Sequence, residues 1–107
     1  MKLTVWGCRG SLPVSSKDML KYGGNTTCIE LRLNDRTVIV IDAGTGIRNL
    51  GKKLIKEPAL NELYLLLTHS HWDHLMGFPF FLPVFSDKFI IHVRGGPIAK
   101  ESLKKYL

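Results

Sequence analysis

The alternation of apolar and polar positions along the chain predicts five β-strands. Each predicted strand is rich in β-branched, aromatic or other apolar residues. The five segments are residues 2–6, 26–33, 37–42, 62–67 and 89–93. Only Asn34, Asp35 and Arg36 separate the second from the third, which indicates a β-hairpin. No repeat or linker divides the chain, so we expect one domain.

Helical periodicity follows the third predicted strand. We expect Thr45 to be the N-cap of a helix that ends before Pro58. Apolar residues recur there at the spacing i, i+3, i+7 and i+8, namely at Ile47, Leu50, Leu54 and Ile55. Pro97 is expected to open a second helix, which continues to Leu107.

Two of the predicted strands are apolar on both alternating faces. Residues 38–41 read VIVI and residues 63–67 read LYLLL, so we expect their sheet to be covered on both sides. The two predicted helices can cover one face. Little of the remaining sequence can cover the other, so we expect a second sheet elsewhere in a longer polypeptide, or another chain, to do so.

Length and composition restrict the class of protein. The chain has 107 residues, of which 45% are hydrophobic and 22% charged, as is typical of one globular domain. Its apolar runs are far shorter than the roughly 20 residues of a membrane helix, so we expect no membrane partner. Because Gly7 and Cys8 follow the first strand at once, we find no signal-peptide core and expect a cytoplasmic location.

Charge and cysteine content add two expectations. The formal net charge is +6, from fifteen Lys and Arg against nine Asp and Glu, which favours anionic partners such as phosphate-bearing small molecules or nucleic acid. Cys8 and Cys28 do not form a CxxC pair. We expect both to be reduced thiols in or near the core.

The candidate chemistry lies directly after the fourth predicted strand, where residues 69–74 read HSHWDH. His69 and His71 are two positions apart, so in extended backbone their imidazoles lie on the same side, about 6–7 Å apart, and can converge on one cation. Asp73 and His74 lie where the chain turns, which directs them to a neighbouring position. Imidazole and carboxylate ligands suit Zn, Mn, Fe or Co.

These six residues form the HxHxDH motif, through which the chain resembles the metallo-β-lactamase-like superfamily of metal-dependent hydrolases. Other segments are similar to its cytoplasmic phosphodiesterase branch, which includes ribonuclease Z and cyclic-nucleotide phosphodiesterases. They are WGCRGSLP at 6–13, YGGNTTC at 22–28, IDAGTG at 41–46 and HLMGFPFF at 74–81. The resemblance implies an α/β fold, the αββα sandwich, of which residues 1–107 would form the N-terminal half.

The resemblance also implies roles for the motif. His69 and His71 would bind one divalent transition metal, and Asp73 and His74 a second, with Zn expected first and Mn or Fe as alternatives. Asp73 would be the catalytic residue, because it would both ligate a metal and orient the nucleophilic water. Asp42 is a candidate for orienting a ligand imidazole or anchoring the motif loop, or it is a strand-end turn residue. We assign no substrate-binding residue.

The chain departs from the superfamily in its missing ligands. The superfamily completes its site with a further His, an Asp and another His from a C-terminal half, and none of these is present. His92 falls inside the fifth predicted strand, so we interpret it as a strand residue. We therefore expect this chain alone to hold an incomplete site and to be part of a longer enzyme or to associate as a homo-oligomer.

The leading functional hypothesis is a metal-dependent hydrolase that cleaves a phosphodiester, in a cyclic nucleotide or RNA-like substrate, by metal-activated water. A thioesterase or lactonase of the same superfamily is an alternative, and a non-catalytic binding module on a half-fold is another. The aromatic segment at 78–85 could line a substrate entrance or plug the core, and we favour the plug. Residues 25–27 (NTT) could hold substrate or cap a loop.

Overall fold

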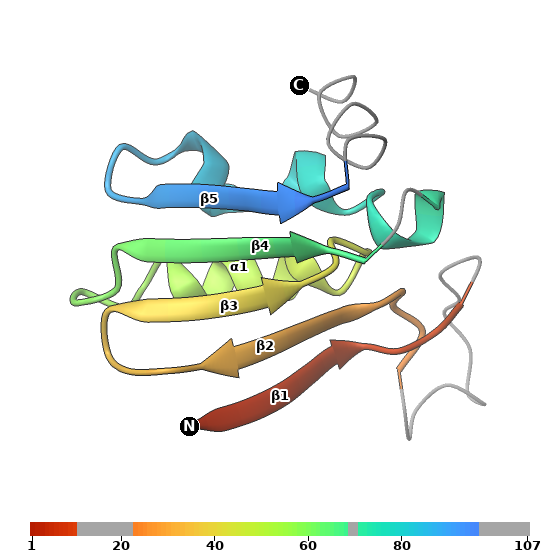
Figure 1. The fold of residues 1–107 in the computed structure, drawn as a ribbon, viewed down its shortest axis with the longest axis horizontal. Coiled ribbons are helices and arrows are strands. Elements are labelled where there is room, and N and C mark those ends of the chain that lie inside the picture. Colours follow the sequence, from red (N-terminus) through yellow and green to blue (C-terminus); the bar gives the residue numbers. More distant parts are fainter. Residues whose placement is uncertain (11–22, 69–70, 97–107) are drawn as a thin grey trace.

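The computed structural model describes residues 1–10, 23–68 and 71–96, whose strands form one five-stranded mixed sheet (Figure 1). The first three strands pair antiparallel, whereas the third, fourth and fifth pair parallel. In sheet order they are β1 (Lys2–Gly7), β2 (Cys28–Arg32), β3 (Thr37–Ile41), β4 (Glu62–Leu67) and β5 (Ile90–Gly95). The expected hairpin between β2 and β3 is confirmed, and the mixed sheet with its helix is an α/β arrangement. The second predicted helix, at 97–107, lies outside the described residues.

Four predicted strands differ from the structure by one or two residues: β1 continues to Gly7, β3 ends at Ile41, and β2 and β5 differ at both ends. The second strand is shorter than residues 26–33 because the carbonyls of Thr26 and Thr27 accept hydrogen bonds from the glycines at 46 and 44, not from a neighbouring strand. The fifth strand begins at Ile90 and ends at Gly95, later than the predicted 89–93. Phe89 precedes it and is buried in the core.

Helix α1 (Ile47–Leu54) connects β3 to β4 and buries the predicted apolar stripe, except that Ile55 lies after the helix and is exposed. The predicted N-cap was wrong. Gly46 is the N-cap, because Thr45 Oγ1 instead accepts a hydrogen bond from the backbone N–H of Thr26 at 2.9 Å. A Cβ at Gly46 would lie 2.6 Å from the Trp6 carbonyl oxygen, so the chain needs glycine there. No helix among the described residues has the length and apolar character needed to cross a bilayer.

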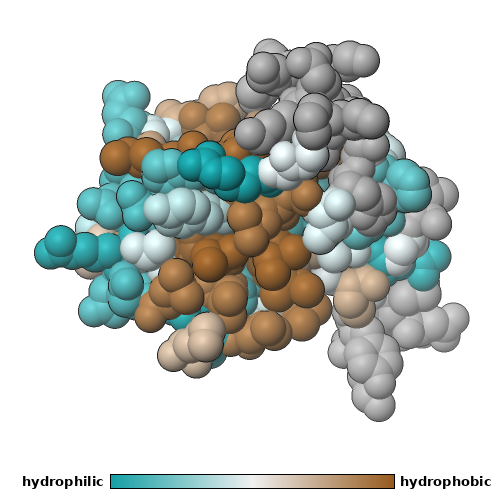
Figure 2. Space-filling view, in the orientation of Figure 1, coloured by the Kyte–Doolittle hydropathy of each residue, from teal (hydrophilic) through white to brown (hydrophobic). Residues whose placement is uncertain are grey.

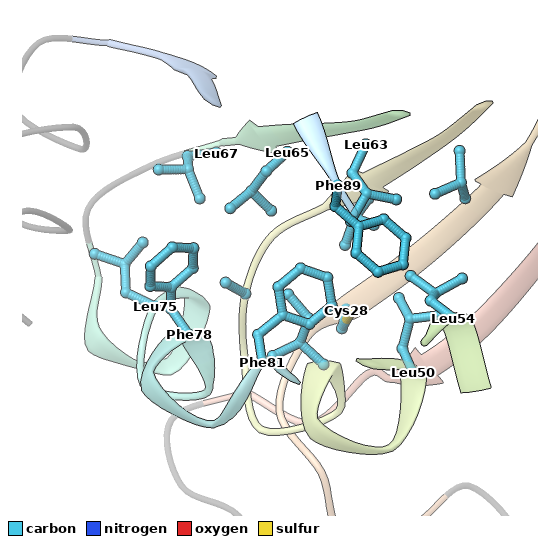
Figure 3. Close-up of a cluster of buried hydrophobic side chains, with 14 of the residues drawn as sticks. Cys28, Leu50, Leu54, Leu63, Leu65, Leu67, Leu75, Phe78, Phe81 and Phe89 are labelled. Atoms are coloured by element: carbon cyan, nitrogen blue, oxygen red, sulfur yellow. The ribbon is translucent and has the colours of Figure 1, made fainter. Parts of the chain in front are cut away.

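One face of the sheet carries the hydrophobic core (Figure 3). Inward side chains of β3 and β4 pack there against α1 and against a series of 3₁₀ turns: η2 (Trp72–His74), η3 (Phe78–Phe80) and η4 (Leu82–Phe85). Phe78 and Phe81 are buried in this cluster, which confirms the core plug for these two rings. Phe80 and Phe85 are 62% and 73% exposed, so the plug does not include them.

The opposite face of the sheet is apolar and only partly covered by the described residues. Figure 2, which views this face, shows apolar side chains gathered over the strands, while α1 lies behind the sheet in Figure 1. On β1, Leu3 and Val5 are 62% and 54% exposed. By the alternation of side chains and the strand register, they share the face with residues that are half-buried, namely Ile29, Leu31, Ile39, Ile41 and Leu66. Among the described residues, this face of the sheet is therefore covered only in part.

A buried carboxylate joins β1, β2 and α1 on the core side of the sheet. Glu30 is 1% exposed, and its oxygens accept hydrogen bonds from Trp6 Nε1 at 3.0 Å and Arg32 at 2.9 Å. Lys53 Nζ of α1 lies 3.3 Å away, and Arg32 also pairs with Glu57 at 2.6 Å. Burial alone would raise the pKa of Glu30, but the hydrogen bonds from Trp6 and Arg32 and the charge of Lys53 outweigh it and lower that pKa.

We expect Glu30→Gln to lower the free energy of unfolding at pH 7 by about 2 kcal/mol, because the variant leaves two cations without their buried partner. A carboxyl whose pKa is lowered by folding stabilises the protein above its unfolded pKa of about 4.3 and loses this effect as pH falls through the folded pKa. The difference in free energy of unfolding between Glu30→Gln and the unmodified protein should therefore narrow below about pH 4. Urea unfolding at several pH values measures it, with the exposed Asp87→Asn as a control. A gap that is the same at pH 3 and pH 7 would contradict this.

Candidate metal centre

Asp42 occupies a special backbone position where β3 ends. Its φ is 65°, in the left-handed region that aspartate tolerates better than most residues. Its N–H donates to the carbonyl of Leu66 in β4 at 2.8 Å. The side chain is 3% exposed, so the turn places a carboxylate under the carboxyl ends of two parallel strands. This is the edge at which α/β sheets commonly bind ligands.

The carboxylate of Asp42 holds both ends of the HxHxDH segment. Its Oδ1 accepts the backbone N–H of Thr68 at 2.8 Å, and its Oδ2 accepts the Thr68 hydroxyl at 2.8 Å. The same Oδ2 lies 2.8 Å from Nδ1 of His74. The structure thus supports both suggested roles of Asp42, orientation of an imidazole and anchoring of the loop. A simple turn residue would bond only to its own neighbouring backbone, whereas the carboxylate of Asp42 contacts Thr68 and His74.

His74 and Asp73 place two donor atoms close together. Nε2 of His74 lies 3.5 Å from Oδ2 of Asp73, and the two side chains are 15% and 14% exposed. Because Nδ1 of His74 faces Asp42, Nε2 is the ring nitrogen that faces Asp73. An oriented imidazole nitrogen beside a carboxylate is a donor pair suited to a divalent transition cation.

The remaining motif residues are placed less completely. His71 is exposed and lies at the start of the 3₁₀ turn η2, whereas His69 lies outside the described residues. Within residues 1–10, 23–68 and 71–96, no group of three or more His, Cys, Asp or Glu side chains could hold a metal ion. The described part of the chain therefore brings together Asp73 and His74 with Asp42 behind them, and the four-residue ligand set stays a prediction.

Thr68 is a contributor that the sequence reasoning missed. It ends β4 and binds Asp42 through both its N–H and its hydroxyl. Its position immediately before His69 was the available signal, because the residue that leaves a strand sets the direction of the loop that follows.

Close backbone packing supports the site from the other side. The N–H of Ala43 donates to the carbonyl of His74 at 2.7 Å, and the N–H of Gly77 donates to the carbonyl of Ala43 at 2.9 Å. A Cβ built on Gly77 would lie 2.0 Å from the carbonyl oxygen of Gly44. The turn after β3 and the turn after the motif are thus held backbone to backbone, which is possible only without a side chain at 77.

Cys28 lies beneath this region but is unsuited to its chemistry. The thiol is buried, and burial, with the negative charges of Asp42 and Glu30, raises its pKa well above the ordinary value. The thiolate, which is the nucleophilic and metal-binding form, is therefore disfavoured. The expectation of a core thiol is confirmed for Cys28, whereas Cys8 is exposed.

Comparison with known proteins identifies the family of the chain. The sequence model of the metallo-beta-lactamase superfamily matches residues 22–106. The chain belongs to the metallo-beta-lactamase superfamily. It is 31% identical over 65 residues to a hydroxyacylglutathione hydrolase of Saccharophagus degradans, a match that covers 61% of this chain and 23% of that protein. No solved structure matches the chain significantly.

We expect Gly77→Ala to destabilise the protein by about 3 kcal/mol or more, because its methyl group would overlap the backbone at Gly44. Urea unfolding measures the loss. Gly96→Ala is the matched control, since a Cβ there meets no atom of the described residues within 4 Å, and it should unfold like the unmodified protein. Equal stability of the two variants would show that the turns do not pack as described.

Proposed function

We propose that this chain supplies part of the active site of a metal-dependent hydrolase. The observation that carries the proposal is the placement of His74 between two carboxylates, with Nδ1 against buried Asp42 and Nε2 beside Asp73. A structural histidine on a surface turn does not need such an arrangement. A metal ligand does, because a carboxylate on one ring nitrogen fixes the orientation and basicity of the other.

We assign one metal to His69 and His71 and a second to Asp73 and His74, as the motif implies. The donor types fit two divalent transition ions, with zinc the first candidate and manganese or iron the alternatives. Such ions, when bound, supply Lewis acidity and lower the pKa of a coordinated water to about 7. The 3.5 Å separation of His74 Nε2 and Asp73 Oδ2 supports the second of these assignments.

The residues of the chain have separate tasks in this proposal. Asp42 keeps His74 in one orientation and one tautomer, with the proton on Nδ1, so that Nε2 stays a ligand. Asp73 accepts a hydrogen bond from the attacking water and orients it toward the substrate. Thr68 holds the preceding backbone against Asp42, so the whole segment keeps its position during turnover.

We further propose that residues 1–107 form the N-terminal half of an αββα sandwich. The chain spans 23% of the length of the curated relative that it matches. A second sheet, from the same polypeptide or a second copy, would cover the apolar face that includes the exposed Leu3 and Val5 and would complete the ligand set. Covering such a face would remove apolar surface from water, and each Å² of apolar surface buried stabilises the assembly by roughly 25 cal/mol.

For the substrate we propose a phosphodiester, in a cyclic nucleotide or an RNA-like molecule. The net charge of +6 supports this choice because such substrates are anions. A thioester is the second candidate, and the similarity to a hydroxyacylglutathione hydrolase favours it. Metal-assisted hydrolysis serves acyl and phosphoryl compounds alike, so the residues beside the metals must distinguish them.

We expect His74→Ala to remove bound transition metal and hydrolytic activity together. Asp42→Asn should keep the ligands but weaken metal affinity by about 10- to 100-fold, because only the orienting carboxylate is lost. His92→Ala is the matched control, since His92 stacks on Tyr64 in β5 and β4, and it should retain metal and activity. Elemental analysis with metal titration measures these effects. Full metal content in His74→Ala, or none in the unmodified protein, would contradict the proposed centre.

We expect the metal-loaded protein, in its longest natural form, to hydrolyse bis-p-nitrophenyl phosphate faster than a thioester such as S-lactoylglutathione. Values of kcat/KM for the two substrates measure this preference. A higher kcat/KM for the thioester than for the phosphodiester would show that the substrate is a thioester. If neither is hydrolysed although metal is bound, the proposed reaction is wrong.

A further inference from the structure

A pocket of about 410 Å³ lies beside the candidate centre. Asn25, Thr45, Arg48, Gly77 and Phe80 line it, so three segments meet there: the loop before β2, the first turn of α1 and the turn that follows His74. Gly77 connects the pocket to the centre, because its N–H is bonded to Ala43, whose own N–H is bonded to His74.

Hydrogen bonds within the wall determine which polar groups the pocket can offer. Thr45 Oγ1 accepts the N–H of Thr26 at 2.9 Å and donates its hydrogen to Oδ1 of Asn25 at 3.2 Å. The hydroxyl hydrogen of Thr45 and the amide oxygen of Asn25 are therefore both in use. The NH₂ group of Asn25 is a pure donor, and its amide oxygen, which already accepts from Thr45, keeps one further lone pair.

Arg48 adds a positive charge to these donors. It lies in the first turn of α1, is exposed and lines the pocket. A guanidinium carries only donors, in a planar fork that matches the oxygens of a carboxylate or phosphate. None of the described residues that line the pocket is acidic, and their side chains include the NH₂ donor of Asn25 and the positive charge of Arg48.

Phe80 supplies an apolar wall. Its ring is 62% exposed, although the neighbouring Phe78 and Phe81 are buried in the core. An exposed ring at the mouth of a pocket offers a face for a flat or apolar group.

We propose that this pocket is a substrate subsite that binds an anionic group, a phosphate or a carboxylate, attached to an apolar or aromatic body. Arg48 and the NH₂ of Asn25 bind the anion, and Phe80 contacts the attached body. The assignment of the pocket to the substrate rests on the proposed hydrolase function, whereas its preference for anions rests on the wall alone. Within that function, the subsite holds the part of the substrate that does not react, and Arg48 decides which substrates are accepted.

The test is direct binding, which needs no turnover. Isothermal titration calorimetry compares phenyl phosphate, benzoate, inorganic phosphate and neutral benzamide, with the protein as purified and again with a chelator present. We expect phenyl phosphate or benzoate to bind with 1:1 stoichiometry and benzamide not to bind. The tighter of the two anions identifies the group, and binding should persist in the chelator, since Arg48 and Asn25 are not metal ligands.

Variants locate the bound anion. Arg48→Gln should weaken binding of the preferred anion by roughly tenfold or more, because it removes charge-assisted hydrogen bonds. Phe80→Ala should remove the preference for phenyl phosphate over inorganic phosphate. Arg36→Gln is the matched control: Arg36 is exposed in the β2–β3 hairpin, which joins the ends of the strands away from the pocket, and its loss should change affinity less than twofold.

Three results would overturn the inference. They are unchanged anion affinity in Arg48→Gln, an equal loss in Arg36→Gln, which would indicate attraction by overall charge, and equal binding of benzamide and benzoate. A protein that binds the anion but neither holds metal nor hydrolyses an ester would refute the proposed function and leave the anion pocket established. A metal-loaded, active protein that binds none of these anions would refute the anion pocket and leave the proposed function standing.

Discussion

The candidate site depends on one buried carboxylate. Asp42 adopts a left-handed backbone conformation at the end of β3 and, from there, binds Thr68 at the end of β4 and His74 in the following turn. Two neighbouring parallel strands and the motif are thereby fixed to one another by a single side chain. A buried carboxylate is costly unless its oxygens are satisfied, and Asp42 meets this requirement with the groups that the site needs to position.

A second buried carboxylate, Glu30, lies on the core side of the sheet, and its partners differ in charge from those of Asp42. Glu30 is as buried as Asp42, but its partners are Trp6, Arg32 and Lys53, which come from the sheet and α1. That carboxylate is neutralised by two cations and keeps the helix against the antiparallel strands. Asp42 has no such cations among the contacts described for it, and its partners are a neutral threonine and an imidazole. The first arrangement stabilises the fold, and the second leaves a negative charge beside the residues that would receive a cation.

Local patterns predicted much of this structure. A short apolar run identified β4 to the residue, and helical spacing identified the buried stripe of α1. The two strands that are apolar on both faces predicted the partly uncovered face of the sheet. The errors occurred where contacts distant in sequence decide the outcome. Thr45 looked like an N-cap, but its hydroxyl oxygen accepts a hydrogen bond from the backbone N–H of Thr26, which lies 19 positions earlier. The motif was visible in the sequence, whereas the bonding of Thr68 to Asp42 and the position of Arg48 at the pocket depend on which loops meet in space.

The separations between bonded partners also bear on how the molecule reaches its native state. Thr26 and Thr45 are 19 positions apart, Trp6 and Glu30 are 24 apart, and Asp42 and Thr68 are 26 apart. Each of these contacts closes a long loop, so the chain loses conformational entropy before the contact stabilises it. The parallel pairings of β3, β4 and β5 also join segments that are distant in sequence. The hairpin of β2 and β3 needs no such closure. The chain should therefore form its hairpin early, and the turn that carries Asp73 and His74 only as the sheet is completed. A kinetic intermediate would then have secondary structure but not the arrangement of the candidate site.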